Sequence, residues 1–205
     1  MKSDKFIIGL YGNAGSGKNS VAQILNTFFG YKQLSFAGPL KRACEILFGL
    51  SPEFYEQHRQ LKEIPHPYWH LSPREIWQRF GTEAMRDTFG KDFWIILLSK
   101  AIENDTYSHF VISDVRFENE IAYVLNSGGV IIHLTRPEAA SKVCTSHRSE
   151  RYIDLSRFNK DKIFKLINDG GLKELKHKTK QLHSLIMTKV EQSILFAKYK
   201  RALIY

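Results

Sequence analysis

The stretch FIIGLYGNAGSGKNS, residues 6–20, decides the fold. About Phe6 to Leu10 it is apolar without alternation, which is typical of a central parallel strand covered by helices on both faces. The pattern GxxxxGK follows, and apolar residues then recur at helical spacing from residue 21 to 28. In this order, backbone N–H groups and a helix N-terminus converge on phosphate oxygens. Residues 12–20 are therefore predicted to form a phosphate loop, from which Lys18 reaches β- and γ-phosphates.

The position after Lys18 departs from the usual pattern of such loops. A Ser or Thr hydroxyl there ligates Mg²⁺ in the standard loop, whereas this chain has Asn19. An amide oxygen also coordinates a hard cation, but it is neutral and its longer side chain changes the geometry. Ser20 lies one helix position further on. The residues alone leave open whether the loop keeps a full metal site or a weakened one.

Further apolar stretches recur along the chain. Strands are predicted at residues 32–37, 109–113, 129–134 and 162–167, with helical patterns between them. This alternation predicts an α/β fold, in which a parallel five-stranded sheet is flanked by helices and joined by right-handed crossovers.

Helix starts are marked between the second and third predicted strands. Pro39 can begin one helix, and Ser51 with Pro52 can open another. The tetrapeptide SPRE, residues 72–75, is a capping box with Ser as the N-cap and Glu as the third helical residue, ahead of the helical pattern IWQRFGTEAMRDTF. Residues 56–71 contain two prolines and no apolar period, which predicts a loop or flap.

Composition indicates one globular domain. The chain has 205 residues, of which 43% are hydrophobic and 25% charged, close to the average for soluble domains. No run approaches the ~20 apolar residues of a membrane span, and no signal peptide is recognisable, so a cytoplasmic location is expected. Cys44 and Cys144 lie far apart, and the histidines show no metal-binding spacing, which argues against a disulfide framework or a zinc site.

The basic charge is concentrated in the tail. Residues 171–205 contain eight Lys or Arg against two Glu, so they carry +6 of the net charge of +9. Apolar residues recur there at roughly helical spacing with lysines between them, which favours a helix with one solvated face over a nucleic-acid or membrane surface. A homodimer that packs through the apolar side of this tail is compatible with the pattern.

Charged residues follow the third and fourth predicted strands. Asp114 stands at the carboxyl end of a strand, where α/β sheets place ligand residues, and suits an Mg²⁺ site opposite the phosphate loop; a helix N-cap is the alternative. Arg116 could hold a phosphate with two hydrogen bonds or form a surface ion pair. Further on, His147 and four arginines in a weakly apolar stretch suit either a lid that closes over phosphates or a solvated loop: Arg136, Arg148, Arg151 and Arg157.

Taken together, the segments GNAGSGKNS, SFAGPLK, SPREIWQRFGTEAMRDTFGKDFWI, VISDVRFENE, SHRSE and INDGGLKEL resemble the deoxynucleoside monophosphate kinases of tailed phages, a branch of the P-loop nucleoside monophosphate kinases. The resemblance covers about residues 6–183. It implies one P-loop kinase domain over residues 1–183, with an acceptor-binding region at about 36–95 and a short lid at about 136–157. Residues 184–205 have no counterpart and are expected to form a C-terminal amphipathic helix.

The resemblance implies transfer of the γ-phosphoryl group of ATP to a deoxynucleoside monophosphate, with Mg²⁺. Its catalytic residues would be Lys18, Asp114, Arg116 and Arg148, and its metal ligands Ser20, Asn19 and Asp114. The ATP-binding residues would be Gly12, Asn13, Ala14, Gly15, Ser16, Gly17, Lys18, Asn19, Ser20, Asn168 and Gly170, the last two bordering the adenine through their backbone. The acceptor would be bound by Phe36, Lys41, Trp77, Arg79, Glu83, Arg86, Arg136 and Arg151, with Phe80 as a further candidate for stacking on the base.

The family often has an acidic residue directly after the lysine and a hydroxyl next, so Asn19 replaces a carboxylate while Ser20 keeps the family pattern. Substituting Asn19 by Asp is therefore expected to keep or raise activity. Two other functions stay open at this point: a catalytically weak nucleotide-binding protein, or another small-molecule P-loop kinase of the dephospho-coenzyme A or phosphomevalonate type.

Overall fold

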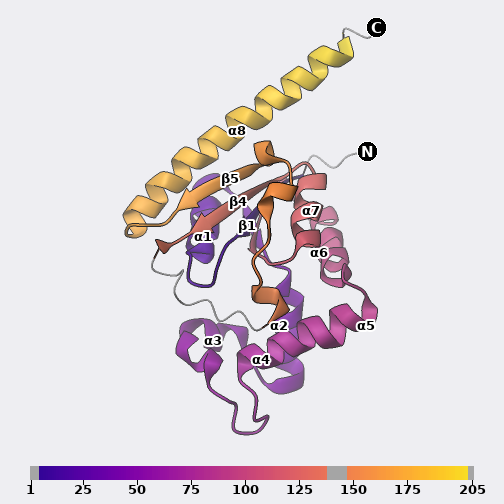
Figure 1. Cartoon of the computed structure of the whole chain (residues 1–205), viewed down its shortest axis with the longest axis vertical. Helices are drawn as coiled ribbons and strands as arrows, with labels where there is room; N and C mark the ends of the chain where they lie inside the picture. The colour runs from indigo at the N-terminus through magenta and orange to yellow at the C-terminus, as the bar shows by residue number, and fades with distance from the viewer. Residues whose placement is uncertain (1–4, 138–146, 203–205) are drawn as a thin grey trace.

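The computed structural model describes residues 5–137 and 147–202 and places one parallel sheet at the centre of the chain (Figure 1). The strand order is β2-β3-β1-β4-β5, and every neighbouring pair is parallel. The predicted five-stranded parallel α/β fold is thereby confirmed. The strands are β1 (Phe6–Tyr11), β2 (Lys32–Leu34), β3 (His109–Val115), β4 (Val130–Thr135) and β5 (Ile163–Ile167).

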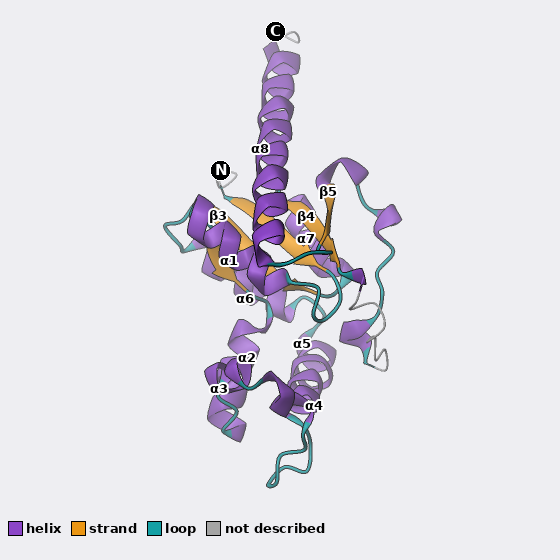
Figure 2. Cartoon of the chain, turned by 90° about the vertical axis from the view of Figure 1, so that its left-hand side faces the viewer, coloured by secondary structure: helices purple, strands orange, loops and turns teal. Residues whose placement is uncertain are grey.

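Helices connect the strands and cover both faces of the sheet (Figure 2). The α-helices are α1 (Lys18–Phe29), α2 (Ala37–Phe48), α3 (Pro52–Gln57), α4 (Pro73–Gln78), α5 (Asp87–Phe89), α6 (Phe93–Glu103), α7 (Glu118–Asn126) and α8 (Leu172–Ala202). The 3₁₀ turns described are η1 (Arg59–Glu63), η4 (Arg148–Glu150), η5 (Leu155–Arg157) and η6 (Lys160–Lys162), and η2 (Arg79–Arg86) is a π-helix.

Strand β1 is apolar throughout because each of its faces meets a separate part of the core. Ile8 and Leu10 pack with residues of α1 and α8, whereas Ile7 and Tyr11 pack with residues of α2, α6 and α7. Alternate side chains of a strand point to opposite faces, so a strand between two helical layers has no polar face. The same arrangement positions the loop after β1 at the carboxyl edge of the sheet.

Helices α3 and α4, which belong to the region between β2 and β3, lie beyond this edge, on the opposite side of the sheet from the far end of α8 (Figures 1 and 2). Strand β2 ends at Leu34, earlier than the predicted 37, and α2 already begins at Ala37, so Pro39 occupies its first turn. Residues 56–71 are helical at their start, through the end of α3 and the turn η1, and irregular afterwards.

The capping box at the start of α4 is present. Ser72 Oγ accepts from the Glu75 N–H at 3.3 Å, and Glu75 Oε2 accepts from the Ser72 N–H at 2.8 Å. The π-helix η2 that follows was not predicted. There the Gly81 carbonyl accepts from Trp94 Nε1 at 2.9 Å, and a Cβ at Gly81 would lie 2.8 Å from Leu40 Cδ2. The wide turn is thus packed between α2 and α6, and π-turns of this kind are frequent at functional sites.

Helix α8 is one continuous helix of 31 residues, so the expected division at 183/184 falls inside it. Its first half contributes Leu175, Thr179 and Ile186 to the interior, while residues 191–196 are all exposed. In Figures 1 and 2 this end extends beyond the rest of the molecule. Among the described residues, no helix combines the length and the apolar character needed to cross a membrane. Of the two cysteines, Cys44 is buried and Cys144 lies outside the described residues.

Candidate functional site

The phosphate loop joins β1 to α1 in a conformation that requires glycine. Gly15 and Gly17 have φ angles of 79° and 104°, and a Cβ at Gly12 would lie 2.2 Å from the Leu134 carbonyl oxygen. Helix α1 begins directly at Lys18, with no side-chain cap and no acidic residue in its first turn. Its first N–H groups and the positive end of its dipole are therefore available to an anion.

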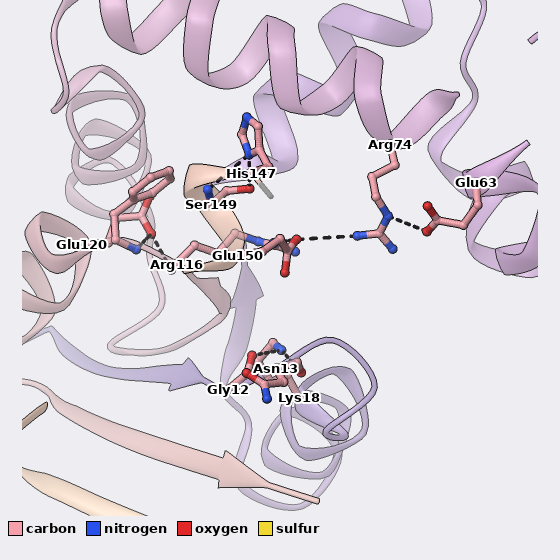
Figure 3. A network of polar contacts seen from close by, with 11 residues as sticks. Gly12, Asn13, Lys18, Glu63, Arg74, Arg116, Glu120, His147, Ser149 and Glu150 are labelled. Atoms are coloured by element: carbon pink, nitrogen blue, oxygen red, sulfur yellow. Dashed lines mark hydrogen bonds and ion pairs between the residues drawn. The ribbon is translucent and has the colours of Figure 1, made fainter. Parts of the chain in front are cut away.

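Lys18 lies folded over this loop (Figure 3). Its Nζ donates to the carbonyl oxygens of Gly12 at 2.5 Å and Asn13 at 2.8 Å. Burial, and then the charge of Arg116, lower the pKa of Lys18 to about 8, although Glu150 and Asp114 oppose the shift. The loop therefore concentrates positive charge that a bound phosphate would stabilise.

Asn168, directly after β5, supports the phosphate loop through a hydrogen bond from its side chain. Its Nδ2 donates to the Ser16 carbonyl oxygen at 2.9 Å, and its own N–H donates to the Thr135 carbonyl oxygen at 2.8 Å. The side chain is buried, and a Cβ at Gly17 would lie 2.6 Å from it. From the sequence, Asn168 and Gly170 are expected to border the adenine through their backbone. The side-chain hydrogen bond from Asn168 to the phosphate loop was not predicted. Gly170 lies against the carboxylate of Glu174.

Two of the predicted metal ligands, Asn19 and Ser20, differ in their exposure and contacts. Asn19 is exposed, and its Nδ2 donates to Glu56 Oε1 at 3.2 Å. Ser20, one position on, is half-buried. Nearby, Ser16 Oγ is buried without a hydrogen-bond partner among the described residues. Asn19 thus uses its amide N–H groups toward the acceptor region and leaves its amide oxygen for other contacts.

Asp114 caps helix α2. Its two carboxylate oxygens accept from the N–H groups of Phe36 at 2.8 Å and Ala37 at 2.9 Å. This is the helix N-cap alternative noted from the sequence, although the cap comes from a neighbouring strand and not from the preceding residue. Asp114 also lines a cavity between the sheet edge and the acceptor region. Since each carboxylate oxygen has two acceptor sites, capping does not exhaust this side chain.

That cavity has a volume of about 180 Å³, and we call it the acceptor cavity. It brings together six of the predicted site residues, namely Phe36, Lys41, Trp77, Arg86, Asp114 and Arg116. The Lys41 ammonium lies 5.6 Å from the centre of the Trp77 ring, and Trp77 Nε1 is buried without a described hydrogen-bond partner. The cavity therefore offers cations, an aromatic face and an unused donor to a polar planar ligand.

Other predicted residues lie outside this cavity. Arg79 is exposed, and Phe80 packs against the core. Glu83 accepts from His147 Nε2 at 3.1 Å, and Arg148 pairs with Asp87 at 2.5 Å. Of the remaining two, Arg151 lines a small pocket over the phosphate loop, and Arg136 is exposed just after β4. Residues 138–146 of the expected lid lie outside the described residues.

Glu150 lines both the acceptor cavity and a small pocket over the phosphate loop, and Figure 3 shows it between Arg116 and Arg74. Its Oε1 accepts from Arg116 Nη1 at 2.5 Å and lies 3.6 Å from Arg74 Nη1. Burial by itself would lower the pKa of Arg116. The negative charges of Glu150 and then Asp114 outweigh this effect, so the pKa of Arg116 is raised. Two arginines thus share one carboxylate at a position that also suits a phosphate.

Glu120 is a second carboxyl group that the sequence analysis did not single out. It is 2% exposed and accepts from the N–H groups of Arg116 at 2.7 Å and Phe117 at 3.1 Å. Burial raises its pKa to about 8. Arg86 lies 3.6 Å from it and stacks on the Phe117 ring at 3.8 Å. The available signal was its place at the start of a helix directly after Asp114 and Arg116, where a Glu side chain bonds backward to N–H groups.

The chain is similar in sequence to several known proteins. A family model described as "Deoxynucleotide monophosphate kinase" matches residues 51–179. A protein of Acanthamoeba polyphaga mimivirus, assigned as a deoxynucleotide monophosphate kinase, is 36% identical over an alignment of 157 residues, which covers 70% of this chain and 80% of the mimivirus protein. The deoxynucleoside-5'-monophosphate kinase of Escherichia phage T5 is 23% identical over an alignment of 232 residues, covering 82% of this chain and 92% of its own.

Among solved structures, TT1252 from Thermus thermophilus is similar with a TM-score of 0.52 and 19% identity, over 88% of this chain and 97% of its own, and so has the same fold. The extent of the family match and the identity to the mimivirus protein decide the assignment. The chain belongs to the deoxynucleotide monophosphate kinase family.

Proposed function

We propose that the protein transfers the γ-phosphoryl group of ATP to a deoxynucleoside 5'-monophosphate, giving the diphosphate and ADP. One observation carries this proposal beyond family membership. The pocket over the phosphate loop and the acceptor cavity share the same three residues at their junction, Arg116, Ser149 and Glu150. Phosphates bound on the two sides would therefore meet at Arg116, as transfer between them requires.

On the donor side, residues 12–20 would hold the phosphates of ATP. Backbone N–H groups at the start of α1 bind the β- and γ-phosphates, and Lys18 exchanges its bonds to two loop carbonyls for bonds to phosphate oxygens. Asn168 keeps the loop in shape, and with Gly170 it would border the adenine. Arg151, in the pocket over the loop, would add positive charge there, as would Arg136 at the end of β4.

On the acceptor side, the monophosphate would lie in the acceptor cavity. Its base would stack on Trp77, beside Phe36, and its phosphate would face Arg116 and Lys41. Glu150 would release Arg116 when the phosphate arrives, because an anion with two negative charges competes for the guanidinium better than one carboxylate does. Arg79, Glu83 and Arg148 lie outside the cavity, so any contact of theirs with the acceptor would require a change of conformation.

Mg²⁺ fits the donor set beside the loop. Ser20 would supply a hydroxyl, Asn19 an amide oxygen and Asp114 a carboxylate, and hard oxygen ligands of this kind, together with phosphates and water, are what Mg²⁺ prefers. When bound, the ion would neutralise phosphate charge during transfer. Asn19 already turns its amide nitrogen toward Glu56, which leaves the oxygen as the atom to face a cation.

The protein side of the reaction consists of positioning and charge stabilisation. An oxygen of the acceptor phosphate bonds to the γ-phosphorus, and the bond from that phosphorus to the oxygen bridging to the β-phosphate breaks, so that ADP leaves with the electron pair. A phosphate monoester loses its second proton at a pKa of about 6, so the attacking oxygen is ionised at neutral pH and needs no general base. Lys18 and Arg116 would hold the charge on both sides of the transferred group.

A coupled assay of ADP release tests this function. ATP and Mg²⁺ are offered with each of the four deoxynucleoside monophosphates and, separately, the ribonucleoside monophosphates; we expect turnover with at least one deoxynucleotide. Binding of ATP without turnover of any monophosphate would instead support the weak nucleotide-binding protein. Neither that function nor a dephospho-coenzyme A or phosphomevalonate kinase is favoured by the family match.

A further inference from the structure

Glu56, near the end of α3, connects the phosphate loop to the acceptor region. Its Oε1 accepts from Asn19 Nδ2 at 3.2 Å, and its Oε2 lies 3.0 Å from Lys62 Nζ. Arg59 forms a third contact with the same carboxylate. One side chain thus contacts both the first turn of α1 and the turn η1, two segments far apart in the sequence.

The partners of Glu56 extend to the two ligand sites. Lys62 lines the acceptor cavity, and its side chain is 16% exposed, against 40% for Glu56. Lys41, in the same cavity, has a pKa lowered first by burial; Asp114 and Glu56 oppose that shift, whereas Lys62 adds to it. Glu56 therefore offsets the mutual repulsion of two lysines that face the acceptor, while its other oxygen contacts the loop that holds the donor.

We propose that Glu56 is a positioning residue for phosphoryl transfer, which sets the acceptor region against the phosphate loop through the Asn19–Glu56–Lys62 contact. The proposal rests on the proposed function, and it concerns how the two sites are aligned. Misplacement of reacting groups by a small distance lowers the rate strongly, so a contact between the two sites acts on the reaction without touching either substrate.

The contact also explains why Asn suits position 19. Glu56 is an ionised acceptor, so its partner must be a donor, and the amide N–H groups of Asn19 supply one. An Asp at this position would place two carboxylates about as close as the present 3.2 Å hydrogen bond. Repulsion between them would push α3 away from α1. We therefore expect Asn19→Asp to impair the protein. The family pattern gives the opposite expectation, namely that Asn19→Asp keeps or raises activity.

Exchanging the two groups tests the proposal. The variants are Asn19→Asp, Glu56→Gln and the double variant, in which the amide introduced at position 56 can donate to the carboxylate introduced at position 19. Glu45→Gln, on the exposed side of α2, is the matched control for loss of a carboxylate. Deoxynucleoside monophosphate binding is measured by calorimetry without ATP or Mg²⁺, so that a metal cannot mask the repulsion, and kcat and KM are measured with both.

We expect Asn19→Asp to weaken monophosphate binding by about tenfold and Glu56→Gln by about threefold. In Glu56→Gln, the KM for ATP should change by less than about twofold. The double variant should bind better than Asn19→Asp alone, and Glu45→Gln should equal the wild type. Single variants that match the control, or a double variant no better than Asn19→Asp, would overturn the proposal. If the wild type binds monophosphates but turns none of them over, the proposed kinase function is overturned independently of the role of Glu56. If the wild type binds no monophosphate, both the proposed function and the role of Glu56 are overturned.

Discussion

The lowered pKa of Lys18 predicts how ATP affinity depends on pH. ATP requires the charged ammonium, and in the unliganded protein this group has a pKa of about 8. Around pH 7, Lys18 is already charged, so binding needs no proton. Around pH 9, about one molecule in ten carries the charge, and ATP must bind together with a proton. The affinity for ATP should therefore fall by about tenfold between these two pH values.

The affinity for ATP falls as pH rises because ATP binding raises the pKa of Lys18. Bound phosphates stabilise the ammonium, so the pKa of Lys18 is higher in the complex than in the free protein, and affinity is lost as pH rises through the free-state value. The phosphates of ATP lose their last proton at a pKa of about 6, below this range, and do not contribute to the slope.

Isothermal titration calorimetry with a non-hydrolysable ATP analogue measures the effect. Two buffers of different ionisation enthalpy count the protons taken up, for which we expect about half a proton per ATP at pH 8. Lys18→Arg is the control, because a guanidinium stays charged over the whole range and should remove the slope even where it weakens binding. A flat wild-type profile, or the same slope in Lys18→Arg, would refute the argument.

Three further perturbations test other parts of the site. Asn168→Ala leaves the buried Ser16 carbonyl without its donor, so unfolding in urea should show a loss of about 1–3 kcal/mol; an unchanged midpoint would mean that the loop does not need this support. Glu150→Gln removes the charge that competes for Arg116, and monophosphate binding measured by calorimetry should tighten by about threefold, whereas weaker binding would make Glu150 part of the ligand site. Ending the chain after Val190 removes residues of which 191–196 are all exposed, and it should leave turnover and Tm unchanged. Ending the chain after Leu185 also removes buried Ile186, and it should lower Tm much more than turnover. Sedimentation of both truncated forms tests the predicted homodimer.

Much of the fold could be predicted because its signals are local. The strand, glycine loop and helix of residues 6–29 are each set by neighbouring residues, and the positive φ angles at Gly15 and Gly17 explain the glycines without reference to the rest of the chain. The capping box at Ser72 is likewise complete within four residues. Apolar runs without alternation indicated a sheet covered on both faces.

Tertiary structure decided how the site is assembled, because its decisive contacts join residues far apart in the chain. Asn168 holds a loop 152 positions away, and Asp114 caps a helix that begins 77 positions earlier. The π-helix η2 also follows from packing, between Leu40 and Trp94. Glu56 and Glu150 resemble ordinary surface carboxylates in the sequence, since their contacts with Asn19 and Arg116 join residues 37 and 34 positions apart. The sequence determined that a phosphate loop forms; only the folded chain determined which charges surround it, because desolvation and ion pairing depend on distances in space.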